Sequence, residues 1–196
     1  MRSNVFATWF LLLVIGGCQS APEILREDIR LLNHNEYVVL SLKSLDFAVS
    51  ENVVQADSNV FMSIALPADL PSSGGALCNE GGNMRIKESS ENTKECVCMQ
   101  TYVQKGVAVS NTDPYMLRNI LFASRGKGDI EVVISKKDLS SQTTAEDLVQ
   151  MGYTEAIGFK TNRPNTTWYR YAATIFGGGD GRVENHEGAC LVFTSR

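Results

Sequence analysis

Short runs of apolar and β-branched residues, separated by polar turns, dominate the chain from residue 36 onward. Runs of this length and spacing are typical of strands that are joined by hairpins and loops. The pattern predicts strands over the following segments: 37–42, 47–54, 60–66, 84–87, 96–103, 129–135, 156–160, 167–176 and 189–194. We therefore expect a mainly β fold, an antiparallel β-sandwich of jelly-roll-like type.

Helical patterns are confined to three short segments. Residues 22–32 place apolar side chains near one side of a helix that starts with a proline, and residues 145–151 lie between a threonine cap and a glycine. Residues 115–123 follow Asp113-Pro114, a cap with proline at the first helical position, although 120–122 suits a strand equally well. The sandwich should carry two or three short helices, and an α+β fold with helices on one sheet face is the alternative.

Two glycine-rich stretches predict irregular structure. Residues 67–82 combine two prolines and four glycines with polar spacers, which predicts a long surface loop. Residues 177–181 read Gly-Gly-Gly-Asp-Gly and predict a turn.

The start of the chain has the order of a secretory signal. A short positive start precedes an apolar run over 5–15, and small residues follow it. The run is shorter than the ~20 apolar residues that a membrane-spanning helix needs. We expect 1–20 to be a signal peptide and 21–196 to be a single secreted β-rich domain with no membrane span. The alternative is a bacterial lipoprotein, because residues 15–18 resemble a lipobox that would anchor the protein through Cys18.

Charge argues against one class of partner. The net charge is -4, and lysine and arginine are scattered without forming a basic stripe. Binding to a phosphate backbone needs clustered positive charge, so nucleic acid is not expected as a partner.

The cysteines that remain after signal removal are expected to form two disulfides. These are Cys78, Cys96, Cys98 and Cys190, an even number in an oxidising compartment. Cys96 and Cys98 should face the same side of one strand and each bond elsewhere. We expect one bond to close the glycine-rich loop through Cys78, and a second to join Cys190 to Cys96 or Cys98.

The sequence lacks the common signatures of catalysis. Proton transfer near neutral pH would depend on His34 or His186, yet no Gly-x-Ser-x-Gly or His-Glu-x-x-His motif is present. Both histidines are expected to be ordinary surface residues. No cofactor is predicted, and the protein is more consistent with a non-enzyme.

An aromatic segment supplies a candidate ligand site. Trp168, Arg170 and Tyr171 lie on one predicted strand, and tryptophan with arginine is favoured at binding hot spots and sugar-stacking sites. The alternative, which we favour, is a core strand whose arginine reaches the surface.

Two further sites are candidates near the end of the chain. Asp180, Glu184 and Glu187 could form a weak calcium site, although a wide hairpin turn would use the same residues. Asn165 heads a glycosylation sequon in a polar stretch.

These observations favour a secreted extracellular binding or interaction module without catalytic activity, which recognises carbohydrate or protein. Its expected partner is an extracellular protein or glycan. The alternative is a secreted hydrolase that uses a carboxylate pair, for example Asp180 and Glu184.

Overall fold

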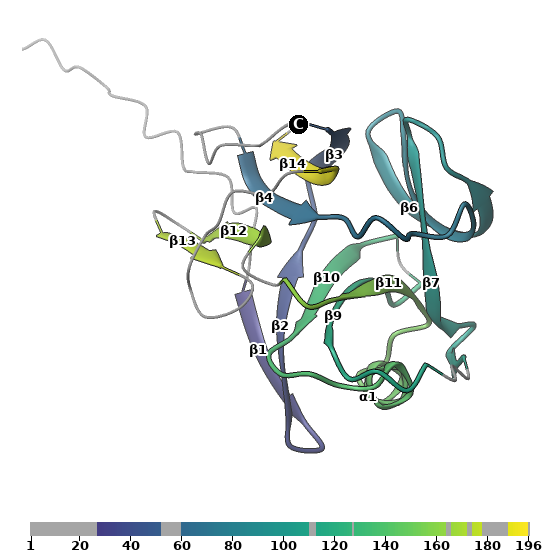
Figure 1. The fold of residues 1–196 in the computed structure, drawn as a ribbon, viewed down its shortest axis with the longest axis vertical. Coiled ribbons are helices and arrows are strands. Elements are labelled where there is room, and N and C mark those ends of the chain that lie inside the picture. The colour runs from purple at the N-terminus through teal and green to yellow at the C-terminus, as the bar shows by residue number, and fades with distance from the viewer. Residues whose placement is uncertain are drawn as a thin grey trace, which may run out of the picture.

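Two antiparallel sheets and one helix make up the described part of the protein (Figure 1). The computed structural model describes residues 27–51, 60–109, 113–126, 128–163, 166–171, 174–177 and 188–195. The predicted mainly β, antiparallel sandwich is confirmed. Within the described residues no helix has the length and apolar character needed to cross a membrane.

The large sheet has nine strands. In spatial order they are β1 (Glu27–Leu32), β2 (Asn35–Ser41), β10 (Ile130–Ser135), β9 (Arg118–Ser124), β11 (Glu155–Thr161), β7 (Cys96–Gln104), β5 (Ser73–Glu80) and β6 (Asn83–Glu91), with β8 (Val107–Ala108) beside β7. The small sheet has five, in the order β13 (Thr174–Gly177), β12 (Trp168–Tyr171), β4 (Val60–Ala65), β14 (Cys190–Ser195) and β3 (Leu45–Ser50).

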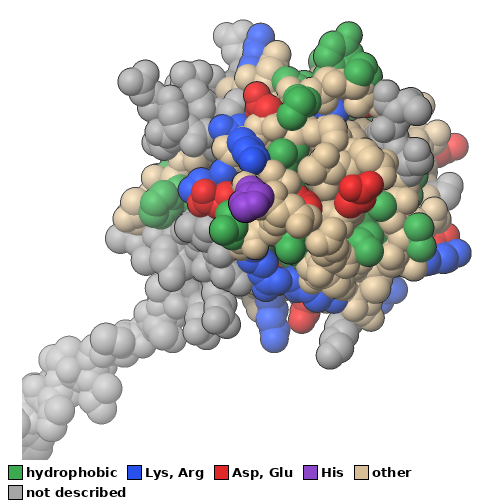
Figure 2. Space-filling view, turned by 90° about the horizontal axis from the view of Figure 1, so that it is seen from below, with side chains coloured by type: hydrophobic (Ala, Val, Ile, Leu, Met, Phe, Trp, Pro, Cys, Tyr) green, Lys and Arg blue, Asp and Glu red, His purple; other side chains and the backbone are tan. Residues whose placement is uncertain are grey.

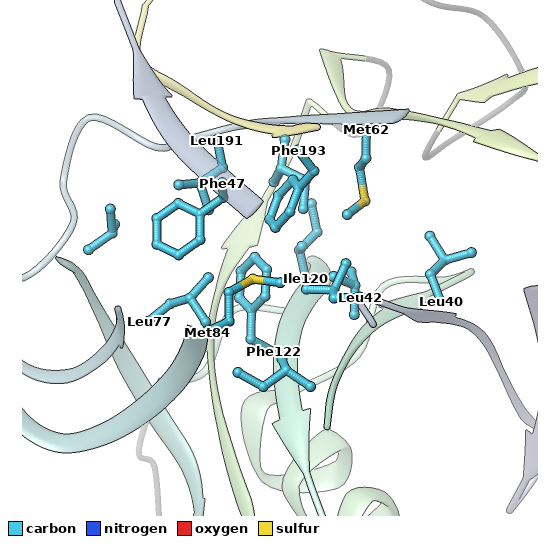
Figure 3. Close-up of a cluster of buried hydrophobic side chains, with 14 of the residues drawn as sticks. Leu40, Leu42, Phe47, Met62, Leu77, Met84, Ile120, Phe122, Leu191 and Phe193 are labelled. Atoms are coloured by element: carbon cyan, nitrogen blue, oxygen red, sulfur yellow. The ribbon is translucent and has the colours of Figure 1, made fainter. Parts of the chain in front are cut away.

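The main core fills the space between the two sheets. Phe193 of β14 lies against Phe47 and Phe122, with ring centroids 5.9 Å and 6.1 Å apart. Aliphatic side chains and methionines from both sheets surround these rings (Figure 3). Close packing of this apolar surface holds the two sheets together.

Helix α1 (Ser141–Gln150) covers the opposite face of the large sheet. Ser140 caps it, because its hydroxyl accepts the backbone N–H of Thr143 at 3.0 Å. Ala145 and Leu148 are fully buried with residues of β2, β9 and β10. The central strands are therefore buried on both faces. This is the helix that the sequence predicts over 145–151.

The other two predicted helices are wrong where the structure describes them, because most of their described residues lie in strands. Residues 120–123 are buried throughout as part of β9, because a strand with both faces covered needs a continuous apolar run rather than alternation. Residues 27–32 form β1, which pairs with β2 through a two-residue turn at Asn33 and His34, both with positive φ. Strand pairing outweighs the weak helical pattern of this segment.

The predicted loop over 67–82 is partly wrong. Residues 73–80 form β5, which pairs with β6 and β7 and buries Ala76, Leu77 and Cys78. Gly75 serves close packing, because a Cβ there would lie 2.7 Å from the Thr101 hydroxyl oxygen and 2.8 Å from an Ile157 methyl carbon.

One of the two predicted disulfides is present. Cys78 of β5 bonds to its cross-strand partner Cys96 of β7, which is consistent with an extracellular protein. Cys98 and Cys190 are buried thiols, so the predicted bond from Cys190 to Cys96 or Cys98 is wrong. The sheet topology explains the error, since Cys190 lies on the small sheet between Ser50 and Ala65 while Cys98 lies toward one edge of the large sheet.

A buried carboxylate fastens α1 to the β1–β2 hairpin. Asp147 is 1% exposed and accepts hydrogen bonds from Asn33 Nδ2 at 2.8 Å, Asn35 Nδ2 at 2.7 Å and the Tyr37 hydroxyl at 2.6 Å. Burial, and then the bond to Asp147, raise the pKa of Tyr37, so the phenol keeps its proton and stays a donor.

Asp147→Ala should destabilise the protein, because three donors would lose their acceptor. We expect a loss of about 2–4 kcal/mol in the free energy of unfolding, measured by urea denaturation. Glu146→Ala, at an exposed neighbour on the same helix, is the control and should change stability by less than ~0.5 kcal/mol. Equal effects of the two substitutions would show that the buried network does not stabilise the fold.

Candidate functional site

A hollow lies among the ends of strands from both sheets. It has a volume of about 550 Å³ and lies where β4 and β11 end and where β9 and β14 begin. A smaller hollow of about 250 Å³ shares Pro67, Asp69, Leu117 and Lys160 with it. We call the two together the Lys160 cleft. Its charged and amide side chains are Asp69, Gln100, Asp113, Lys160, Asn162 and Arg163.

Lys160 lies between the two hollows and is largely buried. Its side chain is 7% exposed, and its ammonium nitrogen lies 3.0 Å from Asp113 Oδ2. The ammonium also donates to the backbone carbonyl of Tyr115. A buried lysine needs such partners, because an unpaired charge away from water is costly.

Asp113 is held in its ionised form. Its Oδ1 accepts the backbone N–H of Tyr115 at 3.0 Å, and its Oδ2 faces Lys160. The bond from Tyr115, followed by that from Lys160, lowers the pKa of the carboxyl below its usual value. A general acid at neutral pH needs a raised pKa, so Asp113 is suited to binding and positioning rather than to proton donation.

Gly158 allows the floor of the cleft to form. It lines the smaller hollow on β11, and a Cβ there would lie 2.2 Å from the backbone oxygen of Ile120. Only glycine permits so close an approach of β11 to β9.

The aromatic strand lies away from the cleft lining. Trp168 is 3% exposed, and the Tyr169 ring packs in the main core with Phe176 at a centroid distance of 5.4 Å. Arg170 is partly buried, and Tyr171 lies at the end of β12. The burial of Trp168 agrees with the favoured core interpretation. Ligand binding by Trp168, Arg170 and Tyr171 stays a prediction.

Several predicted residues fall outside the described part of the chain. These are Cys18, Asn165, Asp180, Glu184, His186 and Glu187. The described residues contain no cluster of three or more potential metal ligands. His34 is exposed at the tip of the β1–β2 hairpin (Figure 2).

Two features of the sequence mark residues of the cleft, although the sequence alone did not identify them as a site. Lys160 is a single charged residue after the apolar run 156–159, where a buried strand ends. Asp113-Pro114 is interpreted from sequence as a helix cap, yet the aspartate bonds the N–H of Tyr115 in an Asx turn. The pairing of Asp113 with Lys160 joins residues that are distant along the chain, so no local pattern reveals it.

Comparisons with known proteins identify the fold but no family. No protein-family model and no curated protein matches this sequence. The structure is similar to the catalytic domain of zebrafish N-acetylglucosamine-1-phosphodiester alpha-N-acetylglucosaminidase, auto-inhibited by its pro-peptide, with a TM-score of 0.63 and 6% identity over 90% of this chain and 85% of that chain. It is also similar to a hypothetical protein from Synechocystis, with a TM-score of 0.60 and 8% identity over 88% of this chain and 62% of that chain. Identities this low establish a shared fold alone.

Asp113→Asn should remove a pH-dependent part of the stability. Because the folded-state pKa of Asp113 is lowered, the carboxylate stabilises the fold above its usual pKa of 3.8, and that contribution is lost as pH falls through the folded value. The stability difference between wild type and Asp113→Asn should be largest near pH 6 and shrink toward pH 3 in urea titrations. Asp138→Asn, a more exposed carboxylate 3.4 Å from Arg118, is the control. A difference that stays constant with pH would contradict the proposed ion pair.

Proposed function

We propose that this chain is a secreted binding module that holds a carbohydrate in the Lys160 cleft. The observation that carries the proposal is a concave site, built from both sheets, in which carboxylates, amides and cations face the same hollow. Sites for small ligands are typically concave and about 300–1,000 Å³ in volume, whereas stable protein partners cover about 800 Å² on each side. The size of the cleft therefore favours a small ligand.

The chemistry of the lining favours a sugar. Hydroxyl groups need both donors and acceptors at close spacing, and Asp69, Asn162 and Arg163 supply both at the cleft. Gln100 adds an amide in the smaller hollow. The zebrafish domain of similar fold is named for an N-acetylglucosamine-1-phosphodiester substrate, which makes N-acetylglucosamine and its 1-phosphate the first probes.

The state of Asp113 favours a role in binding over one as the acid of hydrolysis. Glycoside hydrolysis commonly uses one carboxyl group with a raised pKa as the acid. Asp113 has a lowered pKa and is engaged by Lys160 and by the Tyr115 N–H. The secreted hydrolase stays the alternative because of the fold that this chain shares with the zebrafish enzyme domain.

Calorimetric titration of the secreted chain with N-acetylglucosamine and with N-acetylglucosamine 1-phosphate tests this function. Asn162→Ala should weaken both ligands about tenfold, the effect of losing about 1.4 kcal/mol of hydrogen bonding. Arg163→Ala should weaken the phosphate-bearing ligand more than the neutral sugar, because only that ligand offers an anion.

Lys105→Gln is the matched control, since it removes an exposed positive charge at the opposite end of β11 and should leave both affinities unchanged. Binding of neither ligand would contradict the carbohydrate assignment. If the protein instead released N-acetylglucosamine from the methyl ester of N-acetylglucosamine 1-phosphate, a phosphodiester, it would be a hydrolase.

A further inference from the structure

Two adjacent apolar side chains are exposed beside the cleft. Tyr115 is 72% exposed and Met116 is 61% exposed, and Tyr115 lines the smaller hollow. The other large exposed apolar side chains of the described residues, Leu31, Val49 and Val107, lie singly and do not line either hollow of the cleft. An exposed aromatic ring at the lip of a polar site is a feature of ligand recognition, because it offers an apolar surface where hydroxyl-rich ligands also present one.

Hydrogen bonds hold the backbone at Tyr115 and at Leu117. Asp113 accepts the Tyr115 N–H, Pro114 restricts φ, and Lys160 donates to the Tyr115 carbonyl. On the C-terminal side, Leu117 and Leu139 exchange backbone hydrogen bonds of 3.0 Å and 3.4 Å. The backbone at Tyr115 therefore needs little further ordering when a ligand binds, and a tyrosine side chain has only two χ angles to order.

Lys160 connects the buried ion pair of the cleft with the exposed ring of Tyr115. The same ammonium group contacts the Asp113 carboxylate and the Tyr115 carbonyl, so it holds both ends of the Asx turn against β11. The ammonium is largely buried, whereas the ring that it positions projects to the surface. The exposed ring adds little to packing in the described structure.

We propose that Tyr115 is the residue on which the pyranose ring of the bound sugar stacks, and that Lys160 is a positioning residue that acts through the turn at 113–115. This inference rests on the proposed carbohydrate function and adds the aromatic subsite to it. A sugar ring has an apolar C–H face and a polar edge. The Tyr115 ring would contact the face while Asp69, Asn162 and Arg163 bind the hydroxyl groups.

A double-mutant cycle with N-acetylglucosamine 1-phosphate as the probe tests this inference. Tyr115→Ala should weaken binding about tenfold without lowering the melting temperature, whereas Tyr115→Phe should keep affinity within about twofold, because the ring face is retained. Lys160→Met should weaken binding to a similar degree. The double variant should bind no more weakly than Tyr115→Ala alone, because both substitutions remove the same contact.

The controls separate this inference from the function on which it rests. Val107→Ala removes an exposed apolar side chain at the opposite end of β11 and should have no effect on binding. Lys160→Arg should restore part of the affinity if the turn needs a cation. Wild-type affinity in Tyr115→Ala, together with weakened binding in Asn162→Ala, would overturn the stacking role and leave the carbohydrate function standing. If the losses of affinity in Tyr115→Ala and Lys160→Met added up in the double variant, Lys160 would not act through Tyr115. If the wild type did not bind the sugar phosphate, the proposed carbohydrate function itself would be wrong.

Discussion

The large sheet must be covered on both faces, and the rest of the fold follows from this constraint. The small sheet covers one face through Phe193 and its neighbours, and α1 covers the other through Ala145 and Leu148. Strands between two covers cannot alternate apolar and polar residues, so β9 is apolar throughout its centre. The helix in turn needs an anchor on the sheet, which Asp147 provides through the β1–β2 hairpin.

The cleft forms where strands of both sheets end close to one another. β4 and β14 of the small sheet and β9 and β11 of the large sheet terminate around one hollow, so the loops that leave them must surround it. Backbone groups at strand ends lose their ladder partners and are satisfied by side chains. Asp113 and Lys160 do this for Tyr115, and the bonds that complete the local backbone also shape the Lys160 cleft.

Much of the fold could be predicted from the sequence, but less of the site. Strands such as β2, β4, β7 and β14 were predictable because apolar and β-branched runs mark them directly. β5 was hidden because Gly75 is read as a loop residue, whereas here it allows close contact with Thr101 and Ile157. Whether such a glycine lies in a loop or in a strand depends on contacts with residues that are distant along the chain. A local sequence pattern does not contain these contacts.

The same reason explains why the cleft was not predicted. Asp69 and Asp113 come from two connections and Lys160 from the end of β11. Each is more than forty residues from the next along the chain, and no motif relates them. Asp113-Pro114 has the chemistry of a side chain bonding to nearby backbone, and this chemistry serves a helix cap and an Asx turn alike. Only the lysine at the end of β11 decides between the two, because it holds the turn against the sheet.

Amide chemical-shift mapping can show whether the ligand lies in the Lys160 cleft. Titration of the isotope-labelled protein with N-acetylglucosamine 1-phosphate should shift amide signals of 66–71, 113–117 and 158–163, the segments that form the Lys160 cleft. Signals of the β1–β2 hairpin and of β8 should stay in place. Shifts confined to 168–171, or no shifts in the cleft at saturating ligand, would show that the Lys160 cleft does not hold the ligand.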